Sequence, residues 1–167
     1  MDERVVILAG PLRSGKTTAL SRWAGDLDAA GFLTPEGARG RRIVRLDEEA
    51  DLPFEAGPAQ GPAQVVGRFR ILDSAFEAGA RWLREGLRRK ASWLILDEIG
   101  PLEMAGGGFH AIFREVLETL ARDGESTRLL VVMRDSVADE AAARYGLEFA
   151  PRIGKERLDA LHRKDGP

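Results

Sequence analysis

The segment 10–17 limits what this chain can fold into more than any other part of its sequence. It reads Gly-Pro-Leu-Arg-Ser-Gly-Lys-Thr, fits the phosphate-binding pattern G-x-x-x-x-G-K-[ST], and directly follows the apolar run 5–9. In this pattern a buried strand leads into a glycine-rich turn, and the backbone N–H groups of the turn and of the helix behind it face one anion. The sequence therefore predicts a strand, a phosphate-binding loop and a helix at its start.

Each residue type in this loop has a chemical reason. Gly10 and Gly15 leave room for the turn and for the close approach of a phosphate. Lys16 supplies a positive charge for the β- and γ-phosphates, and the Thr17 hydroxyl is placed for Mg²⁺. We expect the phosphates of a nucleotide to contact the whole run, which consists of Gly10, Pro11, Leu12, Arg13, Ser14, Gly15, Lys16, Thr17 and Thr18.

Composition narrows the class of protein. The 167 residues carry 25 basic and 27 acidic side chains, a net charge of −2, so the overall charge favours neither a nucleic acid nor a membrane as partner. The chain has no cysteine, which excludes disulfides, thiolate catalysis and cysteine zinc sites. It has no apolar run of the roughly 20 residues that a membrane helix needs, and no signal peptide fits before the first strand. We expect a single cytoplasmic domain over residues 1–167, acting as a monomer.

Strand-like and helix-like segments alternate along the chain. Strands are expected over 5–9, 31–34, 42–46, 64–72, 92–98 and 129–133, and helices over 16–30, 74–90, 109–121, 136–145 and 155–163. Such alternation favours an α/β fold of three layers, with a largely parallel central sheet and helices on both faces. Residues 47–64 are acidic and then rich in Pro, Gly and Ala, so we expect an exposed, mobile loop there.

A second chemical feature lies at the end of the expected strand 92–98. This apolar strand ends in Asp97, and a carboxylate at the carboxyl edge of such a sheet is where P-loop proteins hold Mg²⁺. Glu98 comes one residue later and could orient or deprotonate the water that attacks a γ-phosphate. The alternative for Glu98 is a surface residue that caps the next turn. The two motifs together predict that Thr17 and Asp97 bind the metal and that Glu98 and Lys16 act in catalysis.

Several stretches of the sequence resemble one known family. They are 10–18, 31–36, 39–42, the run Asp-Glu-Ile-Gly-Pro-Leu-Glu-Met at 97–104, and Gly108-Phe109. They are similar to the small nucleoside-triphosphatases first described from thermophiles and related to the human cancer-related nucleoside-triphosphatase. The resemblance extends over nearly the whole chain and implies a RecA-like P-loop fold with an added strand and a catalytic glutamate. It also implies slow, Mg²⁺-dependent hydrolysis of several nucleoside triphosphates to diphosphate and phosphate.

Three arginines are candidates for the cation that stabilises the transition state, a contribution worth roughly 10³ to 10⁵ in rate. Arg134 follows the expected strand 129–133 and would project from the carboxyl edge of the sheet, so we prefer it to the others and weigh it against a plain surface charge. Arg13 lies within the loop itself, and Arg157 is the candidate that the family resemblance suggests. Glu103 is either an acid behind the site or a cap of the turn 106–108.

Hydrolysis of nucleoside triphosphates is the function that these features favour. The chain has no asparagine, which removes the Asn-Lys-x-Asp clamp by which regulatory GTPases select guanine, so we expect ATP, GTP and other nucleotides to serve. Two alternatives stay open. One is a nucleotide or small-molecule kinase that uses residues 47–64 as acceptor site or lid and excludes water from the site. The other is a nucleotide-dependent adaptor or switch with negligible turnover.

Overall fold

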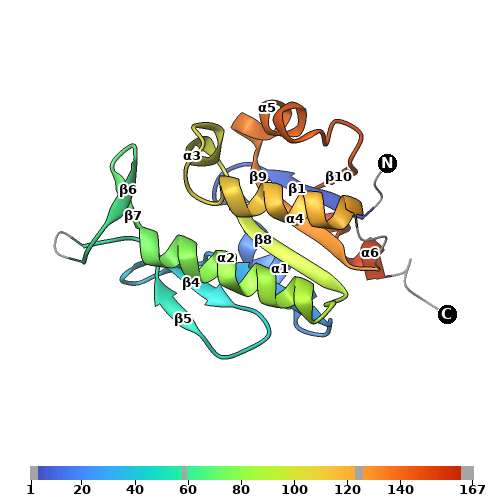
Figure 1. Ribbon diagram of the computed structural model, residues 1–167, viewed down its shortest axis with the longest axis horizontal. Coiled ribbons are helices and arrows are strands. Elements are labelled where there is room, and N and C mark those ends of the chain that lie inside the picture. The colour runs from blue at the N-terminus through green and yellow to red at the C-terminus, as the bar shows by residue number, and fades with distance from the viewer. Residues whose placement is uncertain (1–3, 58–59, 123–125, 163–167) are drawn as a thin grey trace.

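The central sheet of the protein is largely parallel, as expected. The structure is a computed structural model that describes residues 4–57, 60–122 and 126–162. The strand order is β10-β1-β9-β8-β2-β4-β3, with β5 beside β4 (Figure 1). Neighbours from β10 to β2 run parallel, and the pairs that involve β4 are antiparallel. The strands are β1 (Val5–Gly10), β2 (Ala29–Leu33), β3 (Glu36–Gly37), β4 (Gly40–Arg45), β5 (Asp51–Pro53), β8 (Trp93–Ile99), β9 (Arg128–Arg134) and β10 (Arg152–Ile153).

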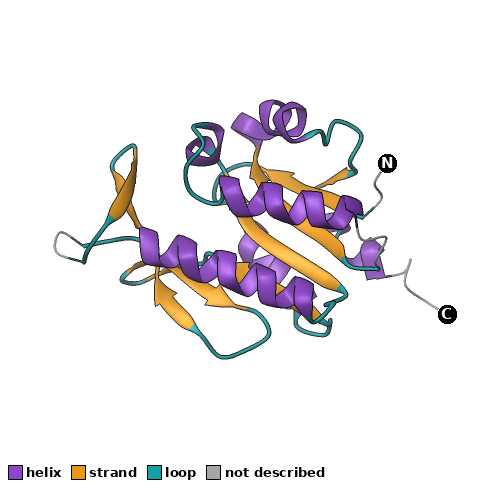
Figure 2. Ribbon diagram, in the orientation of Figure 1, coloured by secondary structure: helices purple, strands orange, loops and turns teal. Residues whose placement is uncertain are grey.

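Helices cover both faces of this sheet, which gives the three expected layers (Figure 2). One face carries α2 (Asp73–Arg88), α4 (His110–Arg122) and α5 (Asp135–Tyr145). The other face carries α1 (Lys16–Ala24), the short 3-10 helix η1 (Lys155–Arg157) and α6 (Asp159–His162). A single turn of helix, α3 (Pro101–Met104), follows β8. None of the helices in the described ranges combines the length and the apolar character that crossing a membrane requires.

Burial on both faces explains the unbroken apolar runs of the central strands. In β1, Val5 and Ile7 belong to the core beneath α2, α4 and α5, whereas Val6 and Leu8 belong to the core beneath α1. When a strand packs on both sides, neither face is polar, so its sequence does not alternate between apolar and polar residues. This is why the segments 5–9, 92–96 and 129–133 read as continuous hydrophobic stretches.

The strand order brings the functional segments to one edge of the sheet. β9 lies between β1 and β8, and this is the added strand that the family resemblance implied. Gly10 at the end of β1 pairs with Arg134 at the end of β9, and Asp97 on β8 pairs with Val132. Because parallel strands share their carboxyl edge, the phosphate-binding loop, Asp97 and Arg134 meet there.

Several expected elements differ in extent. Over the described residues, the expected helix 155–163 is two short helices, η1 and α6. The first helix ends at Ala24 instead of near residue 30, because residues 29 and 30 already belong to β2. The expected strand 64–72 is a hairpin of β6 (Ala63–Val66) and β7 (Phe69–Leu72), which turns at Gly67 with φ 57°. The expected helix 74–90 is α2, which begins at Asp73 and ends at Arg88, and no side chain caps its start.

The segment 47–64 contains more structure than a loop. Asp47 accepts a hydrogen bond from Arg45 at 2.7 Å, β5 pairs with β4, and the side chain of Phe54 is 7% exposed within the core. These contacts arise because β4 runs antiparallel to β2 and β5 folds back antiparallel to β4. Residues 58–59 lie outside the described residues, and the mobility expected for the segment stays a prediction.

Gly31 allows β2 and β8 to approach each other, which generates a stability prediction. Its φ is +105°, and a Cβ there would overlap the backbone oxygen of Ile95, whereas Gly61 has φ +98° and open space around the same position. We expect Gly31→Ala to lower the free energy of unfolding by about 3 kcal/mol or more, because strain and overlap add. Gly61→Ala, the matched control, should cost about 1–2 kcal/mol from the backbone conformation alone. Urea unfolding measures both, and equal losses would contradict this account.

Candidate active site

The loop between β1 and α1 has the geometry of an anion-binding turn. Gly15, the N-cap of α1, has a left-handed backbone with φ 83°, and no side chain caps the helix. The N–H groups of the first turn therefore face the pocket above the loop. Gly10 allows the stem of Lys16 to pack closely, since a Cβ there would lie 3.3 Å from Cδ of that lysine. Residues 12–18 and 34–36 line the pocket together with Arg41, Asp97 and Glu98.

Lys16 folds back onto its own loop. Its ammonium donates hydrogen bonds to the carbonyl oxygens of Gly10 at 2.8 Å and Pro11 at 2.6 Å, and the hydroxyl of Ser14 lies 3.4 Å away. The residue is 7% exposed. A triphosphate that enters the pocket offers charged oxygens in place of these neutral acceptors, and hydrogen bonds to charged groups are the stronger ones. The lysine is thus held beside the position where phosphates would bind.

Asp97 joins three segments at one carboxylate oxygen. Its Oδ2 accepts hydrogen bonds from the Thr17 hydroxyl at 2.8 Å and from the backbone N–H of Thr34 at 3.1 Å. Burial, and then the negative charge of Glu98, raise the pKa of Asp97 to about 6, because a carboxylate removed from water loses solvation. The helix α1, the end of β2 and the end of β8 are therefore fixed relative to one another.

Glu98 faces two guanidinium groups. Its Oε1 lies 2.7 Å from Nε of Arg134 and 3.9 Å from Nη1 of Arg41, and its side chain is 16% exposed. Arg134 therefore reaches the carboxyl edge of the sheet, as expected, and pairs with the carboxylate of Glu98, the candidate base. The two guanidinium groups hold the Glu98 carboxylate in the wall of the pocket.

Glu103 caps backbone N–H groups on both sides of the turn 106–108, the second of the two roles expected for it. It accepts hydrogen bonds from the N–H of Gly100 at 2.9 Å and of Phe109 at 3.0 Å. The residue is 4% exposed, and burial raises the pKa of Glu103. Its two oxygens tie the start of α3 to the start of α4. Glu103 thus shapes the loop behind Glu98.

A row of alternating charges crosses the mouth of the site. Glu36 Oε1 lies 3.5 Å from Nη2 of Arg41 and 3.8 Å from Nε of Arg13. Among the described residues, no acceptor pairs with the buried Nε of Arg41. Since Arg41 also approaches Glu98, the row brings Arg13 and Arg41 to the wall of the pocket in which a polyanion would lie, while Arg134, which does not line this pocket, contacts Glu98.

Two oxygen donors at the end of the loop fit a magnesium ion. Mg²⁺ usually binds one or two protein groups together with phosphate oxygens and waters. The Thr17 hydroxyl and the Asp97 carboxylate lie 2.8 Å apart at the floor of the pocket, next to the N-terminus of α1. Hard oxygen ligands beside a phosphate site have the chemistry that this ion requires.

Of the remaining candidates, Arg13 lines the phosphate pocket and Arg157 does not. Sequence reasoning also missed three residues. Arg13 is 70% exposed, and Arg157 is exposed in η1, where its neighbour Lys155 donates a hydrogen bond to the backbone oxygen of Ser14. Lys155, Arg41 and Thr34 were not among the expected site residues. Arg41 and Thr34 do fall within the family-like stretches 39–42 and 31–36, which were the available signal. Lys155 had none, since it reaches the loop from the other end of the chain.

Comparisons with known proteins agree with this geometry. A family model described as NTPase matches residues 5–145. The nucleoside-triphosphatase THEP1 of Thermotoga petrophila is 32% identical over 126 residues, which are 68% of this chain and 66% of that protein. The enzyme of the same name from Thermococcus kodakarensis is 29% identical over 127 residues, 68% of this chain and 70% of that protein. The alignments thus span about two thirds of each relative.

A solved structure shares the fold. The crystal structure of THEP1 from the hyperthermophile Aquifex aeolicus matches with a TM-score of 0.71 and 22% identity, over 96% of this chain and 95% of that one. This confirms the three-layer P-loop fold. The family model spans the phosphate-binding loop, the strand that ends in Asp97 and Glu98, and Arg134. The chain therefore belongs to the nucleoside-triphosphatase family of P-loop proteins.

Proposed function

We propose that this protein hydrolyses nucleoside 5'-triphosphates to the diphosphate and inorganic phosphate, with Mg²⁺, broad base tolerance and low turnover. The observation that carries the proposal is the position of Glu98, a carboxylate in the wall of the same pocket that the phosphate-binding loop and Asp97 form. The names of the two curated relatives support the reaction.

The proposal assigns a role in hydrolysis to each of the charged side chains at the site. Lys16 exchanges the carbonyl oxygens of its loop for oxygens of the β- and γ-phosphates. Glu98 accepts a proton from the water whose oxygen bonds to the γ-phosphorus. The bond from that phosphorus to the β–γ bridging oxygen breaks, and its electron pair stays on the diphosphate. Arg134 and Arg41 hold the Glu98 carboxylate and meet the negative charge on the transferred phosphoryl group.

Thr17 and Asp97 would hold the Mg²⁺ ion, which when bound neutralises charge on the β- and γ-phosphate oxygens. Low turnover is supported by the contacts that must change first. Lys16 has to leave two carbonyl oxygens, and Glu98 has to open toward water from its 2.7 Å contact with Arg134. We further propose a monomer that acts on free nucleotides in the cytoplasm. Its net charge of −2 gives a nucleic acid no overall attraction.

Replacing Lys16 tests the phosphate site. Lys16→Ala should abolish productive triphosphate binding and leave the fold intact, because the ammonium contacts the loop and not the two hydrophobic cores. Calorimetric titration with ATP measures binding, and the melting temperature serves as the control for folding. If a folded Lys16→Ala protein hydrolysed ATP at the wild-type rate, the site would have to be sought elsewhere.

Replacing the two carboxylates separates their roles. Glu98→Gln keeps the size of the side chain but removes the base, so nucleotide binding should survive while kcat falls by roughly 10² to 10⁴. Asp97→Asn should weaken the Mg²⁺ dependence and the nucleotide affinity together with the rate, since a metal contact acts on ground and transition states alike. The measurements are kcat and nucleotide Kd across Mg²⁺ concentrations. Normal turnover by Glu98→Gln would assign hydrolysis to another group.

The folding stability of Asp97→Asn is the control that separates a loss of activity from a loss of structure. The buried carboxylate has a pKa of about 6, above its ordinary value, so stability is lost as the pH rises through that pKa and the group ionises. An asparagine can accept the same hydrogen bonds from Thr17 and Thr34 without that charge. We therefore expect Asp97→Asn to unfold in urea at pH 8 no more easily than the wild type.

Base tolerance is a further expectation for this site. ATP, GTP, CTP and UTP should be hydrolysed within about one or two orders of magnitude of one another. Each tenfold preference requires about 1.4 kcal/mol of differential binding, and the sequence has no asparagine from which to build a guanine clamp. Competition assays with pairs of nucleotides measure the ratio of kcat/KM. A preference above roughly a thousandfold, about 4 kcal/mol, would show a dedicated base pocket.

A further inference from the structure

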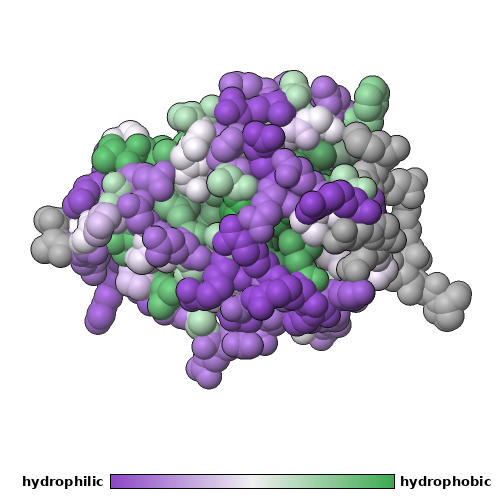
Figure 3. All heavy atoms as spheres, viewed as in Figure 1, coloured by the Kyte–Doolittle hydropathy of each residue, from purple (hydrophilic) through white to green (hydrophobic). Residues whose placement is uncertain are grey.

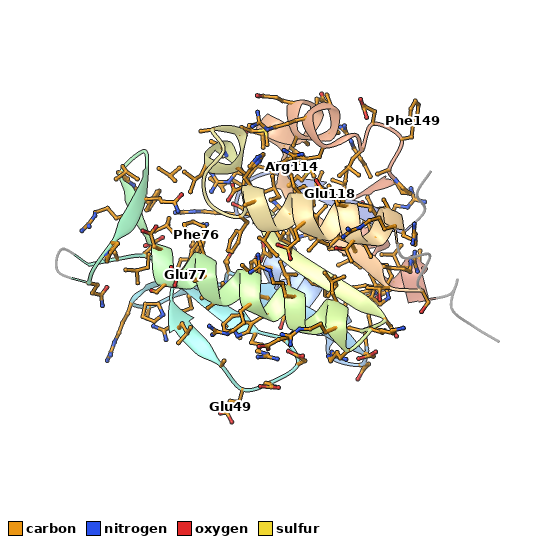
Figure 4. All side chains as sticks on the ribbon, viewed as in Figure 1. Glu49, Phe76, Glu77, Arg114, Glu118 and Phe149 are labelled. Atoms are coloured by element: carbon orange, nitrogen blue, oxygen red, sulfur yellow. The ribbon has the colours of Figure 1, made fainter. Side chains whose placement is uncertain are left out.

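A second cavity lies beside the phosphate pocket. Its apolar wall comes from the hairpin β6–β7, from the segment after β5 and from the first turns of α2 and α4. The side chains are Phe54, Val66, Phe69, Ile71, Phe76 and Phe109, and the cavity is open to solvent on one side, so that its roughly 600 Å³ of free space includes solvent. Figure 4 labels Phe76 at the end of α2 nearest the hairpin. In Figure 3, apolar surface shows beside the hairpin, on the side toward α3.

The two cavities share one wall. Thr34, Arg41 and Glu98 line both of them, and Arg134 lines the apolar one. The apolar cavity thus ends at the carboxylate that faces the phosphate pocket. Its polar lining combines this carboxylate with those of Glu55 and Glu103 and with two guanidinium groups, whereas none of the loop residues 10–18 borders it.

The geometry of phosphoryl transfer relates the wall shared by the two cavities to the direction of attack on the γ-phosphate. The attacking oxygen and the leaving oxygen lie roughly in line through the γ-phosphorus. When the β-phosphate rests on the N-terminus of α1, the attacking group must approach from the far side of the γ-phosphate. Glu98 is the proposed base for that attack, and the apolar cavity extends from Glu98 away from the loop.

The walls of the cavity suit a ring more than water. Phe76 and Phe109 meet edge to face with centroids 4.8 Å apart, and the Phe54 ring is parallel to the Phe109 ring at 6.1 Å. Phe69 is 40% exposed on the hairpin, at the edge of the cavity. Pockets of this composition, apolar with a few polar groups at one end, are typical of sites for small organic molecules. Phe54, Phe76 and Phe109 are buried against one another, so Phe69 is the ring that stands exposed and gains by contact with another ring.

We propose that this cavity binds a small hydroxyl compound with an apolar, ring-sized body, and that its hydroxyl replaces water beside Glu98 as the acceptor of the γ-phosphoryl group. The hydroxyl oxygen forms a bond to the γ-phosphorus while the bond to the β–γ bridging oxygen breaks with its electron pair. The hydroxyl proton passes to the Glu98 carboxylate. The products are a phosphate monoester and a nucleoside diphosphate. This inference rests on the proposed function, because the triphosphate and Glu98 are the same.

The partition of phosphate between alcohol and water tests the proposal. Wild-type protein, ATP and Mg²⁺ are incubated with benzyl alcohol or with methanol at equal molar concentration, and ³¹P NMR gives the ratio of phosphate ester to inorganic phosphate. Methanol can attack without using the cavity. We expect the ratio for benzyl alcohol to exceed that for methanol at least tenfold, which corresponds to about 1.4 kcal/mol. Equal ratios for the two alcohols would overturn the proposal.

Two neighbouring residues of β6 provide a matched pair of variants. Val66 lines the cavity, whereas Val65 is 65% exposed and, one residue away in the strand, lies on the opposite face of the hairpin. Val66→Trp should fill the cavity and reduce the benzyl alcohol ratio to the methanol level, while Val65→Trp should leave it unchanged. The ratio is internally normalised, so a change in overall rate does not affect it. An unchanged ratio in Val66→Trp would also overturn the proposal.

A control reaction without alcohol separates this inference from the function on which it rests. If ATP releases phosphate in that control but no ester forms when benzyl alcohol is added, the acceptor site is contradicted and the proposed hydrolysis stands. Release of neither product would contradict both.

Discussion

The buried carboxylate of Asp97 is the interaction on which the site depends. One oxygen accepts from Thr17 at the start of α1 and from Thr34 at the end of β2, and the residue itself belongs to β8. These contacts fix the phosphate-binding loop against the strand that carries Glu98. Burial disfavours the charge, as the raised pKa of about 6 shows, and a carboxylate kept at such a position despite that cost fits a functional role.

Charge alternation organises the rest of the pocket. Glu36, Arg41, Glu98 and Arg134 form a chain of contacts between 2.7 and 3.9 Å long, so each arginine is held by an acid before any phosphate arrives. Such pairing keeps the arginine side chains near the expected position of the γ-phosphate and prevents them from occupying it. Glu103 supports this arrangement from behind, by fixing the loop that follows Glu98.

Sequence reasoning could name residues of the pocket where the signal is local. The phosphate-binding loop and the pair Asp97-Glu98, which line one pocket, each lie next to an apolar strand whose pattern can be read directly, and their roles stay predictions. Arg41 was not predicted as a site residue because it reaches Glu98 only when β4 folds back along β2. The hairpin β6–β7 was taken for one strand because apolar residues continue on both sides of its turn. The apolar cavity has no local signature, since its phenyl rings come from segments far apart in the chain.

The central claim is that the loop, Asp97 and Glu98 form one hydrolytic site. A crystal structure with Mg²⁺ and a non-hydrolysable triphosphate tests it most directly. The account predicts that the β- and γ-phosphates lie on the N-terminus of α1, that Nζ of Lys16 has exchanged the carbonyl oxygens of Gly10 and Pro11 for phosphate oxygens, and that Glu98 contacts a water in line with the γ-phosphorus. A γ-phosphate bound away from Asp97 and Glu98 would contradict it.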